Sequence, residues 1–124
     1  MTTFYPSFRY EDAPAAIEWL ERAFGFEREM VVEGESEGDV PHAQMRFGDG
    51  LVMLGSTRGD EHDSVVGTGW TYVAVEGDID AHCERARDAG AEIIREPEDQ
   101  EYGSRDYSAR DLEGNVWSFG TYRP

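Results

Sequence analysis

Hydrophobic residues near the start of the chain recur at the spacing of an amphipathic helix. Five of them, within the first 24 residues, fall on one helical face. Asp12 precedes this run and is a typical N-cap residue, while Pro14 suits a first helical turn. Gly25 follows directly and is typical of the position that ends a helix. A helix is therefore predicted between Asp12 and Gly25. The five hydrophobic residues are Ala16, Ile17, Leu20, Ala23 and Phe24.

Alternating polar and apolar residues predict strands on both sides of this helix. Two of the segments that follow it are joined by Asp49-Gly50, a dipeptide typical of two-residue hairpin turns. In that hairpin we expect Phe47 to lie opposite Val52, with the apolar side chains facing the helix. The strands predicted in this half of the chain are residues 4–9, 26–33, 42–47 and 51–55.

The same order of elements occurs a second time after a polar connection. Asp78 is predicted to cap a second helix, which Gly90 ends. The strands predicted in this half are residues 70–75, 91–95, 105–110 and 115–120.

Equivalent residues in the two halves lie at a nearly constant distance along the chain. The pairs are Asp12 and Asp78, Gly25 and Gly90, and Gly50 and Gly114, separated by 64 to 66 positions. Such a repeat indicates two copies of one supersecondary unit. The sequence therefore predicts one α+β domain made of two strand-helix-strand-strand-strand modules. Module 1 covers about residues 1–57 and module 2 about residues 68–124.

The charge of the chain limits its partners. There are 27 acidic residues against 11 basic ones, all of them Arg, and the formal net charge is −16. Nucleic acids and anionic membranes bind positive surfaces, so neither is an expected partner. The charge favours a cationic or neutral small molecule, or simply gives a very soluble surface. The absence of Lys agrees equally with adaptation to high salt and with GC-rich coding.

The cysteine count and the apolar runs indicate a compartment. Cys83 is the only cysteine, which excludes an intramolecular disulfide and favours a reducing environment. The first residues lack the basic start and apolar core of a signal peptide. The longest apolar runs have about four residues, whereas a membrane-spanning helix needs roughly 20. We therefore expect a soluble cytoplasmic protein.

Several motifs, together with the repeat, resemble a known superfamily. They are residues 9–12 (Arg-Tyr-Glu-Asp), which lead to 16–20 (Ala-Ile-Glu-Trp-Leu), and residues 111–117 (Asp-Leu-Glu-Gly-Asn-Val-Trp). Residues 42–50 and 102–105 are similar to a less characterised, glyoxalase-like branch. The whole chain resembles the vicinal-oxygen-chelate proteins: glyoxalase I, bleomycin-resistance proteins and extradiol dioxygenases. This resemblance implies two tandem βαβββ modules that form a curved mixed sheet around a cleft, and a homodimer.

Side chains that alternate with the helix-facing positions are expected to face this cleft. Tyr5, Trp70 and Tyr72 offer flat surfaces for an aromatic or cationic ligand, or fill the core instead. Arg46 and Arg105 suit a carboxylate or phosphate, or pair with a neighbouring acid. The predicted ligand-binding cleft residues are Tyr5, Ser7, His42, Gln44, Arg46, Met53, Trp70, Tyr72, Arg105 and Ser118.

The resemblance also implies four metal-ligand positions, one on each of four strands, which hold His or Glu in metal-dependent members. Carried over by position, they fall on Tyr5, Met53, Trp70 and Ser118, in two pairs that are each 65 positions apart. None of these side chains is a usual ligand for a divalent ion. We therefore predict that the metal site is lost and expect no cofactor.

The histidines and the cysteine are further candidates. His42 begins a cleft-facing strand and is either an acid, a base or a ligand contact, or makes one ordinary hydrogen bond. His62 lies in the acidic segment 59–63, which we interpret as a solvated loop. His82 and Cys83 fall on the second predicted helix, where their spacing offers no nucleophile and base pair, so packing is expected.

Three functions remain open. We favour a metal-free protein that binds a small cationic or aromatic molecule without catalysis, as the bleomycin-resistance proteins imply. The second is a metal-independent lyase, isomerase or epimerase on a small oxygenated substrate. In that case His42 is the acid or base, and Tyr5 and Arg46 are polar stabilisers. The third is a metal-dependent glyoxalase or dioxygenase with its ligands at other positions.

Overall fold

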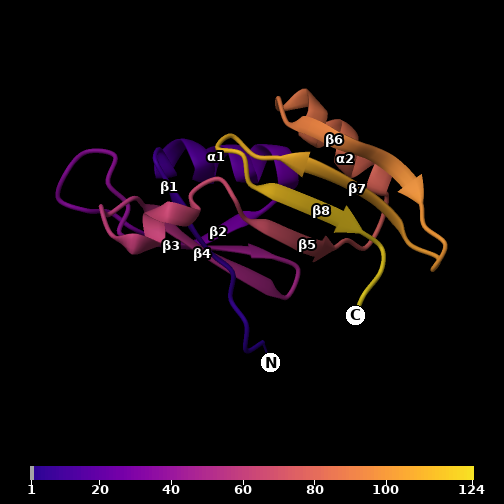
Figure 1. Cartoon of the computed structure of the whole chain (residues 1–124), viewed down its shortest axis with the longest axis horizontal. Helices are drawn as coiled ribbons and strands as arrows, with labels where there is room; N and C mark the ends of the chain where they lie inside the picture. The colour runs from indigo at the N-terminus through magenta and orange to yellow at the C-terminus, as the bar shows by residue number, and fades with distance from the viewer. Residues whose placement is uncertain (1) are drawn as a thin grey trace.

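The computed structural model describes residues 2–124 and contains two copies of a βαβββ unit. Figure 1 shows the two helices along one side of the molecule, with the strands spread beside them. None of the helices in this described range is long and apolar enough to cross a membrane. Module 1 contains β1 (Ser7–Tyr10), α1 (Ala13–Phe24), β2 (Glu27–Val32), β3 (His42–Phe47) and β4 (Gly50–Ser56). The 3-10 helix η1 (Glu61–Val65) leads to module 2, with β5 (Trp70–Ala74), α2 (Ile79–Asp88), β6 (Glu92–Asp99), β7 (Arg105–Arg110) and β8 (Val116–Gly120).

Each module forms its own four-stranded mixed sheet. The strand orders are β1-β4-β3-β2 and β5-β8-β7-β6, so the first strand of each module lies beside its last. β1 runs parallel to β4, and β5 runs parallel to β8. Ser7 pairs with Met53, and Tyr72 pairs with Ser118, so the equivalent pairs are 65 positions apart. The α+β class and the repeat predicted from the sequence are confirmed.

Both helices begin at the predicted capping residues. The Asp12 carboxylate accepts the backbone N–H of Ala15 at 3.1 Å. The Asp78 carboxylate does the same for α2, at 3.1 Å from the Ala81 nitrogen. Each contact supplies a partner to a backbone donor that the first helical turn leaves unpaired. Gly25 ends α1 with a φ of 80°, a left-handed conformation that glycine adopts without steric cost.

The predicted register of the β3–β4 hairpin is wrong by two residues. Met45, not Phe47, lies opposite Val52, and the two turn residues are Gly48 and Asp49. Of these two, Gly48 alone has a positive φ, 59°, which matches the turn type with glycine at its first central position. A shift of two residues leaves every side chain on the same face of the strand. The predicted apolar face of the hairpin is therefore unchanged.

Two strands differ from the prediction by more than one residue. β1 begins at Ser7 rather than Phe4, directly after Pro6, which lacks a backbone donor. β6 continues to Asp99 instead of ending at Arg95, through two irregularities in its pairing with β7. The polar connection between the modules also contains η1, which we had expected to be a solvated loop.

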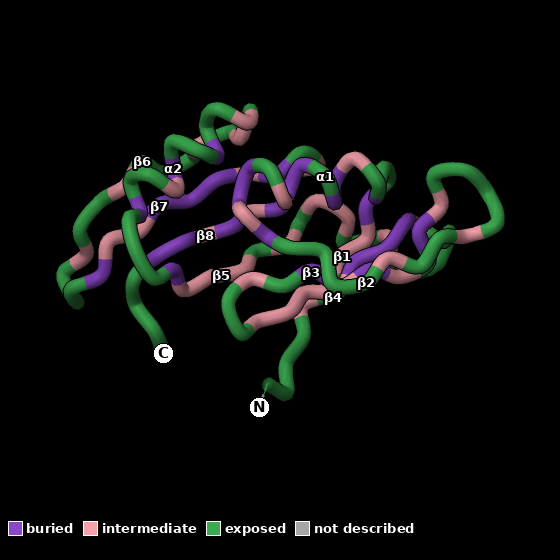
Figure 2. The backbone as a smooth tube through the Cα atoms, turned by 180° about the vertical axis from the view of Figure 1, so that it is seen from behind, coloured by how far each residue is buried: buried purple, intermediate pink, exposed green. Residues whose placement is uncertain are grey.

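The apolar faces of the two sheets pack into one shared core. Phe24 and Phe26, at the end of α1, lie with their ring centres 6.0 and 5.3 Å from that of Trp117 on β8. Phe8 on β1 lies 5.0 Å from the same Trp117 ring. In Figure 2 the buried stretches of the chain follow α1, β7 and β8. Aromatic side chains of both modules therefore bury one another.

The two helices also join the modules. The Trp19 indole N–H of α1 donates to the Ala89 carbonyl at the end of α2, at 2.7 Å. In return, Arg85 of α2 donates to the carbonyl oxygens of Glu21 and Arg22 in the last turn of α1, at 3.0 and 2.9 Å. The Glu21 carbonyl also accepts the backbone N–H of Gly25 at 3.1 Å, and the helix dipole favours a positive charge at this end.

The Asp-x-x-Gly-Asn motif links the modules through a buried carboxylate. Asp111 is 7% exposed and accepts the Tyr10 O–H at 2.6 Å and the Trp117 indole N–H at 3.0 Å. It also accepts a side-chain and a backbone N–H of Asn115, at 3.2 and 3.1 Å, and the backbone N–H of Glu113 at 3.0 Å. Burial, followed by the negative charge of Asp111, raises the pKa of Tyr10. The motif has a structural role.

Replacing Asp111 by Asn is expected to destabilise the fold by about 3 kcal/mol, since each hydrogen bond to a charged group contributes about 1.5–3 kcal/mol. One carboxylate oxygen becomes an NH₂ group, so either the three side-chain donors or the two backbone donors lose their acceptor. Urea unfolding measures the change. Asp49→Asn, at the exposed turn of the other hairpin, is the control and should stay within about 0.5 kcal/mol. Equal effects of the two substitutions would contradict this role.

His82 joins three elements at the interface between the modules. Its ring Nε2 lies 2.9 Å from the carbonyl oxygen of Phe24, and its Nδ1 lies 2.5 Å from the Tyr107 hydroxyl. A carbonyl can only accept, so Nε2 carries the hydrogen and Nδ1 of the neutral ring accepts the Tyr107 O–H. Burial, with a smaller contribution from the charge of Arg85, lowers the pKa of His82 below its ordinary 6.5. The folded state therefore favours the neutral ring.

The free energy of unfolding is expected to fall as the pH drops below about 6.5, because the unfolded chain then binds a proton that folded His82 resists. Above that pH both states hold a neutral ring, and the contribution of His82 is complete. His82→Gln removes the titration while carboxylates titrate in both proteins. Urea unfolding between pH 7.5 and 5.5 should show a steeper loss for the parent protein. Parallel curves for parent and variant would contradict this assignment.

Candidate functional site

Each sheet has one face that no helix covers, which we call its open face. In module 1 this face carries Ser7, Met53 and Gln44, and in module 2 it carries Tyr72 and Ser118 among others. The sequence predicted that the two faces curl toward each other and enclose a single cleft. The sheets do not close in this way, because their apolar faces share one core and the open faces point away from it. They line separate cavities of about 330 and 600 Å³.

Polar side chains on the open face of module 1 form a continuous chain of hydrogen bonds. His42 Nε2 lies 2.8 Å from the Gln44 side-chain oxygen, and the Gln44 amide nitrogen donates to Glu29 at 3.3 Å. Glu29 also pairs with Arg46. Since the amide oxygen only accepts, Nε2 of His42 is the donor. Arg46 pairs with a neighbouring acid, which is one of the two roles that the sequence left open.

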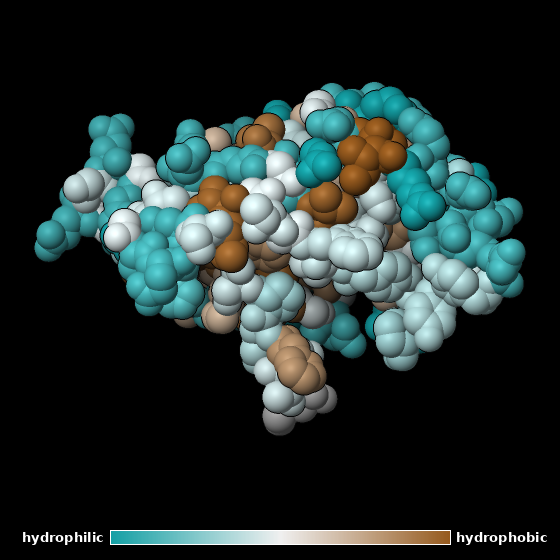
Figure 3. Space-filling model, viewed as in Figure 1, coloured by the Kyte–Doolittle hydropathy of each residue, from teal (hydrophilic) through white to brown (hydrophobic). Residues whose placement is uncertain are grey.

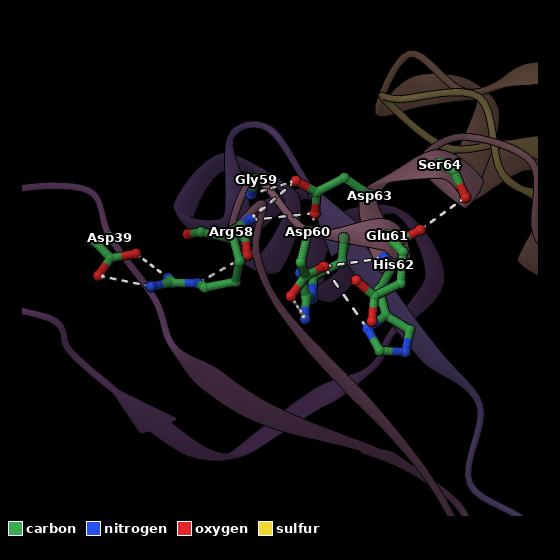
Figure 4. Close-up of polar contacts among 10 residues, drawn as sticks. Asp39, Arg58, Gly59, Asp60, Glu61, His62, Asp63 and Ser64 are labelled. Carbon is green, nitrogen blue, oxygen red and sulfur yellow. Dashed lines mark hydrogen bonds and ion pairs between the residues drawn. The ribbon is translucent and has the colours of Figure 1, made fainter.

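The segment before module 2 is folded over part of this open face. Arg9 on β1 pairs with Asp60 at 3.1 Å and with Asp63 at 3.0 Å. Figure 4 shows the Asp63 carboxylate turned back toward the start of the segment, where it accepts the backbone N–H groups of Arg58 and Gly59. These contacts fix η1 beside β1. Asp60, as the N-cap of η1, is the sequence feature that could have indicated it.

The cavity in module 1 lies between η1 and its open face. Ser7, His42 and Met53 line it from the sheet, and His62 and Val65 line it from η1. His62 therefore lines the same cavity as His42, and its side chain is 70% exposed. We had not expected these two histidines to share a cavity, because their proximity depends on the folding of η1.

The cavity in module 2 is aromatic. It combines residues of β5, β6, β7 and β8 with residues of the β6–β7 loop and of the C-terminal segment after β8, which the sequence did not connect to it. Trp70 is 78% exposed and Tyr102 is 61% exposed, so the rings are accessible from solvent. The cavity is lined by Trp70, Tyr72, Arg95, Gln100, Tyr102, Asp106, Ser108, Ser118, Tyr122 and Pro124.

Two of the three phenols that line this cavity donate hydrogen bonds. The Tyr72 O–H donates to the carbonyl oxygen of Tyr122 at 2.6 Å, and the Tyr102 O–H donates to Asp106 at 2.8 Å. Burial and the charge of Asp106 raise the pKa of Tyr72, while the bond to Asp106 raises that of Tyr102. Both phenols therefore stay protonated near neutral pH and serve as surfaces and donors rather than bases.

Two predicted cleft residues do not belong to the open face of a strand: Tyr5 precedes β1, and Arg105 lies on the helix side of β7. Tyr5 donates its O–H to the carbonyl oxygen of Thr2 at 3.1 Å. Arg105 pairs at 3.0 Å with Asp80 on α2 and at 3.0 Å with Asp99. Successive residues of a strand face opposite sides, so Arg105 faces the helices while Asp106, the next residue of β7, lines the aromatic cavity. Arg105 is thus an ion-pair residue and not part of either cavity.

The sequence reasoning identified part of the aromatic cavity and missed the rest. Trp70, Tyr72 and Ser118 were predicted, whereas Tyr102 and Tyr122 come from loops where strand alternation gives no signal. Arg95 on β6 and Asp106 and Ser108 on β7 were also missed, although the alternation of side chains between the two faces of these strands could have identified them. The complete set of missed lining residues is Arg95, Gln100, Tyr102, Asp106, Ser108, Tyr122 and Pro124.

The four positions that the resemblance assigns to metal ligands do not suit a metal. The Trp70 indole N–H donates to the Ser118 hydroxyl at 2.9 Å, so two of the four side chains bond to each other. An indole N–H is a donor only, and the thioether of Met53 is a poor ligand for hard or borderline divalent ions. Within residues 2–124 no three His, Cys, Asp or Glu side chains cluster in a way that could hold a metal ion.

Comparisons with known proteins agree with this fold. A sequence profile of the Glyoxalase/Bleomycin resistance protein/Dioxygenase superfamily matches residues 4–119. The chain is 31% identical to an uncharacterised protein of Mycobacterium tuberculosis, over 93% of this chain and 71% of that protein. It is similar to the crystal structure of TioX from Micromonospora sp. ML1, with a TM-score of 0.79, 32% identity, and coverage of 99% of this chain and 98% of that one.

A glyoxalase I mutant from Zea mays has the same fold in part of its chain. The TM-score is 0.75 at 21% identity, and the match covers 97% of this chain but 44% of the maize protein. The profile match includes both modules. The chain belongs to the Glyoxalase/Bleomycin resistance protein/Dioxygenase superfamily.

Proposed function

We propose that this protein binds a small aromatic molecule on the open face of module 2, without catalysing a reaction and without a metal ion. The observation that carries this proposal is the cavity of about 600 Å³ bordered by Trp70, Tyr72, Tyr102 and Tyr122. Its volume lies within the range of about 300–1,000 Å³ that is usual for small-molecule sites. Aromatic rings in an accessible cavity supply stacking surfaces for a planar ligand.

The polarity of the protein surface also supports a binding site in this cavity. In the view of Figure 3 the surface is mainly hydrophilic, and hydrophobic side chains appear in a few separate groups. Trp70 is 78% exposed and, unlike Phe4, which is 87% exposed, it lines this cavity. Exposed aromatic groups in a cavity, surrounded by polar residues, are typical of binding sites.

A metal-independent enzyme centred on His42 has less support. Its Nε2 donates to Gln44, which in turn contacts the Glu29–Arg46 pair. That arrangement engages Arg46 with Glu29 and Nε2 of His42 with Gln44, so only Nδ1 of His42 keeps a lone pair for base chemistry. General acid–base catalysis needs a group that is free to reach a substrate proton. The binding proposal requires no such group.

Replacing Trp70 by Ala is expected to weaken binding of the neutral probe 2-naphthamide about tenfold, because a lost aromatic contact costs about 1.4 kcal/mol. Isothermal titration calorimetry measures the dissociation constant. Phe4→Ala is the matched control, since Phe4 is 87% exposed and lies outside the aromatic cavity. An unchanged dissociation constant in the Trp70 variant, or an equal loss in both variants, would contradict the proposed site.

We also propose that the protein forms a homodimer that covers the open faces. Met30 and Val32 are 46% and 43% exposed, on the module 1 strand whose pairing partners are Gln44 and His42. Together with Trp70 they form apolar surface that a second copy would remove from water.

A reducing, cytoplasmic location suits the single, buried thiol of Cys83.

The homodimer is expected to dissociate more readily at low ionic strength, because two chains of net charge −16 repel each other with less screening. Sedimentation equilibrium at about 20 and about 300 mM NaCl compares Debye lengths of roughly 20 and 6 Å. Tighter association at the higher salt concentration is the expected result. A monomer under both conditions, or an affinity independent of salt, would contradict the proposal.

A further inference from the structure

Arg95 is a cation without a partner in a strongly acidic protein. Eight of the eleven arginines form ion pairs with Asp or Glu, and Arg85 donates to two carbonyl oxygens. Within residues 2–124, Arg95 has neither an ion pair nor a hydrogen bond to another side chain, and it lines the aromatic cavity. Arg22, on α1 at the opposite side of the core, is also unpaired but lies outside this cavity.

A row of donors crosses the open face of module 2 and ends at this guanidinium. Tyr72 pairs with Ser118, Ser118 with Ser108, and Ser108 with Arg95, on four neighbouring strands. Neighbouring strands lie about 4.8 Å apart, so the row spans roughly 14 Å. That length accommodates a bicyclic aromatic ring together with an attached acidic group and the side chain that binds it. Tyr72 lies at one end of the row and Arg95 at the other.

The Ser118 and Ser108 hydroxyl groups, in the middle of the row, have one hydrogen that is not used in a hydrogen bond between them. The Trp70 indole N–H donates to the Ser118 oxygen at 2.9 Å, and the oxygens of Ser118 and Ser108 lie 2.7 Å apart. One hydroxyl hydrogen forms the bond between the two serines, so the other has no acceptor among the described residues. In the arrangement in which Ser118 donates to Ser108, this hydrogen belongs to Ser108, the strand neighbour of Arg95, and an added acceptor would satisfy it.

The acid of the same cavity is already occupied. The Asp106 carboxylate accepts the O–H groups of Tyr102 and Ser104, and it pairs across the sheet with Gly120, one row away from Ser108. Two hydroxyl donors reduce the attraction of this carboxylate for a ligand cation. The available groups of the cavity are therefore donors, and they are concentrated on the Arg95 side.

We propose that the ligand of this cavity is an aromatic carboxylate, with its ring against Trp70 and Tyr72 and its carboxylate bound by Arg95 and the free serine hydroxyl. This inference rests on the proposed function, and it assigns the charge of the ligand. It runs against the net charge of −16, which by itself favours a cation. Short-range pairing with a guanidinium outweighs long-range repulsion at physiological salt, because the Debye length is then about 8 Å.

The test compares three probes of one shape: 2-naphthoate, 2-naphthamide and 2-naphthylmethylammonium. Calorimetric titrations at pH 7.5 in 150 mM NaCl should show 2-naphthoate binding about tenfold more tightly than the amide, as one charge-assisted contact predicts. Arg95→Gln should reduce that preference to less than about threefold. Arg22→Gln, the matched control, should retain the preference.

The outcomes separate this inference from the function on which it rests. If the amide or the ammonium compound binds as tightly as 2-naphthoate, the assigned charge is wrong while aromatic binding stands. If Arg22→Gln lowers the preference as much as Arg95→Gln, the carboxylate responds to general charge and the Arg95 contact is refuted. If none of the three probes binds, the aromatic site itself is refuted. Circular dichroism of both variants confirms that these exposed substitutions leave the fold intact.

Discussion

The packing of two apolar sheet faces into one core determines the rest of this structure. Trp117 of module 2 contacts Phe8, Phe24 and Phe26 of module 1, so neither module buries its aromatic residues alone. Because one face of each sheet is used in this way, the opposite face is left open. Residues on the open faces can therefore bind a ligand without disturbing the core. Core residues and open-face residues alternate along the same strands, so substitutions can change one role without the other.

Buried polar contacts reinforce this packing and fix how the modules meet. Asp111 in module 2 holds the hydroxyl of Tyr10 in module 1, and His82 connects α2 to the end of α1. Glu113, in the same hairpin turn as Asp111, accepts the backbone N–H groups of Glu11 and Asp12 at 2.7 and 2.9 Å. A buried polar group left without its partner is costly, so these contacts favour one arrangement of the modules over others.

The sequence predicted the features that depend on spacing along the chain. Helix caps and apolar faces follow from residues a few positions apart, and the internal repeat follows from equivalent residues 64 to 66 positions apart. The turn of the β3–β4 hairpin was misplaced because Gly48-Asp49 and Asp49-Gly50 both suit a two-residue turn, and only the backbone geometry distinguishes them. Tyr102 and Tyr122 were missed because their loops meet β5 through tertiary packing. Arg105 was placed on the wrong face for lack of a β7 register.

Thermal unfolding with divalent ions tests the central claim, which is an aromatic binding site without a metal. The protein would be unfolded with Mn²⁺, Ni²⁺, Zn²⁺ or a chelator, each with and without 2-naphthoate. A ligand at 100 times its dissociation constant adds about 2.7 kcal/mol, which raises the midpoint by several degrees. The account predicts this rise in every condition and none from the ions alone. Stabilisation by a divalent ion that the chelator reverses would contradict it.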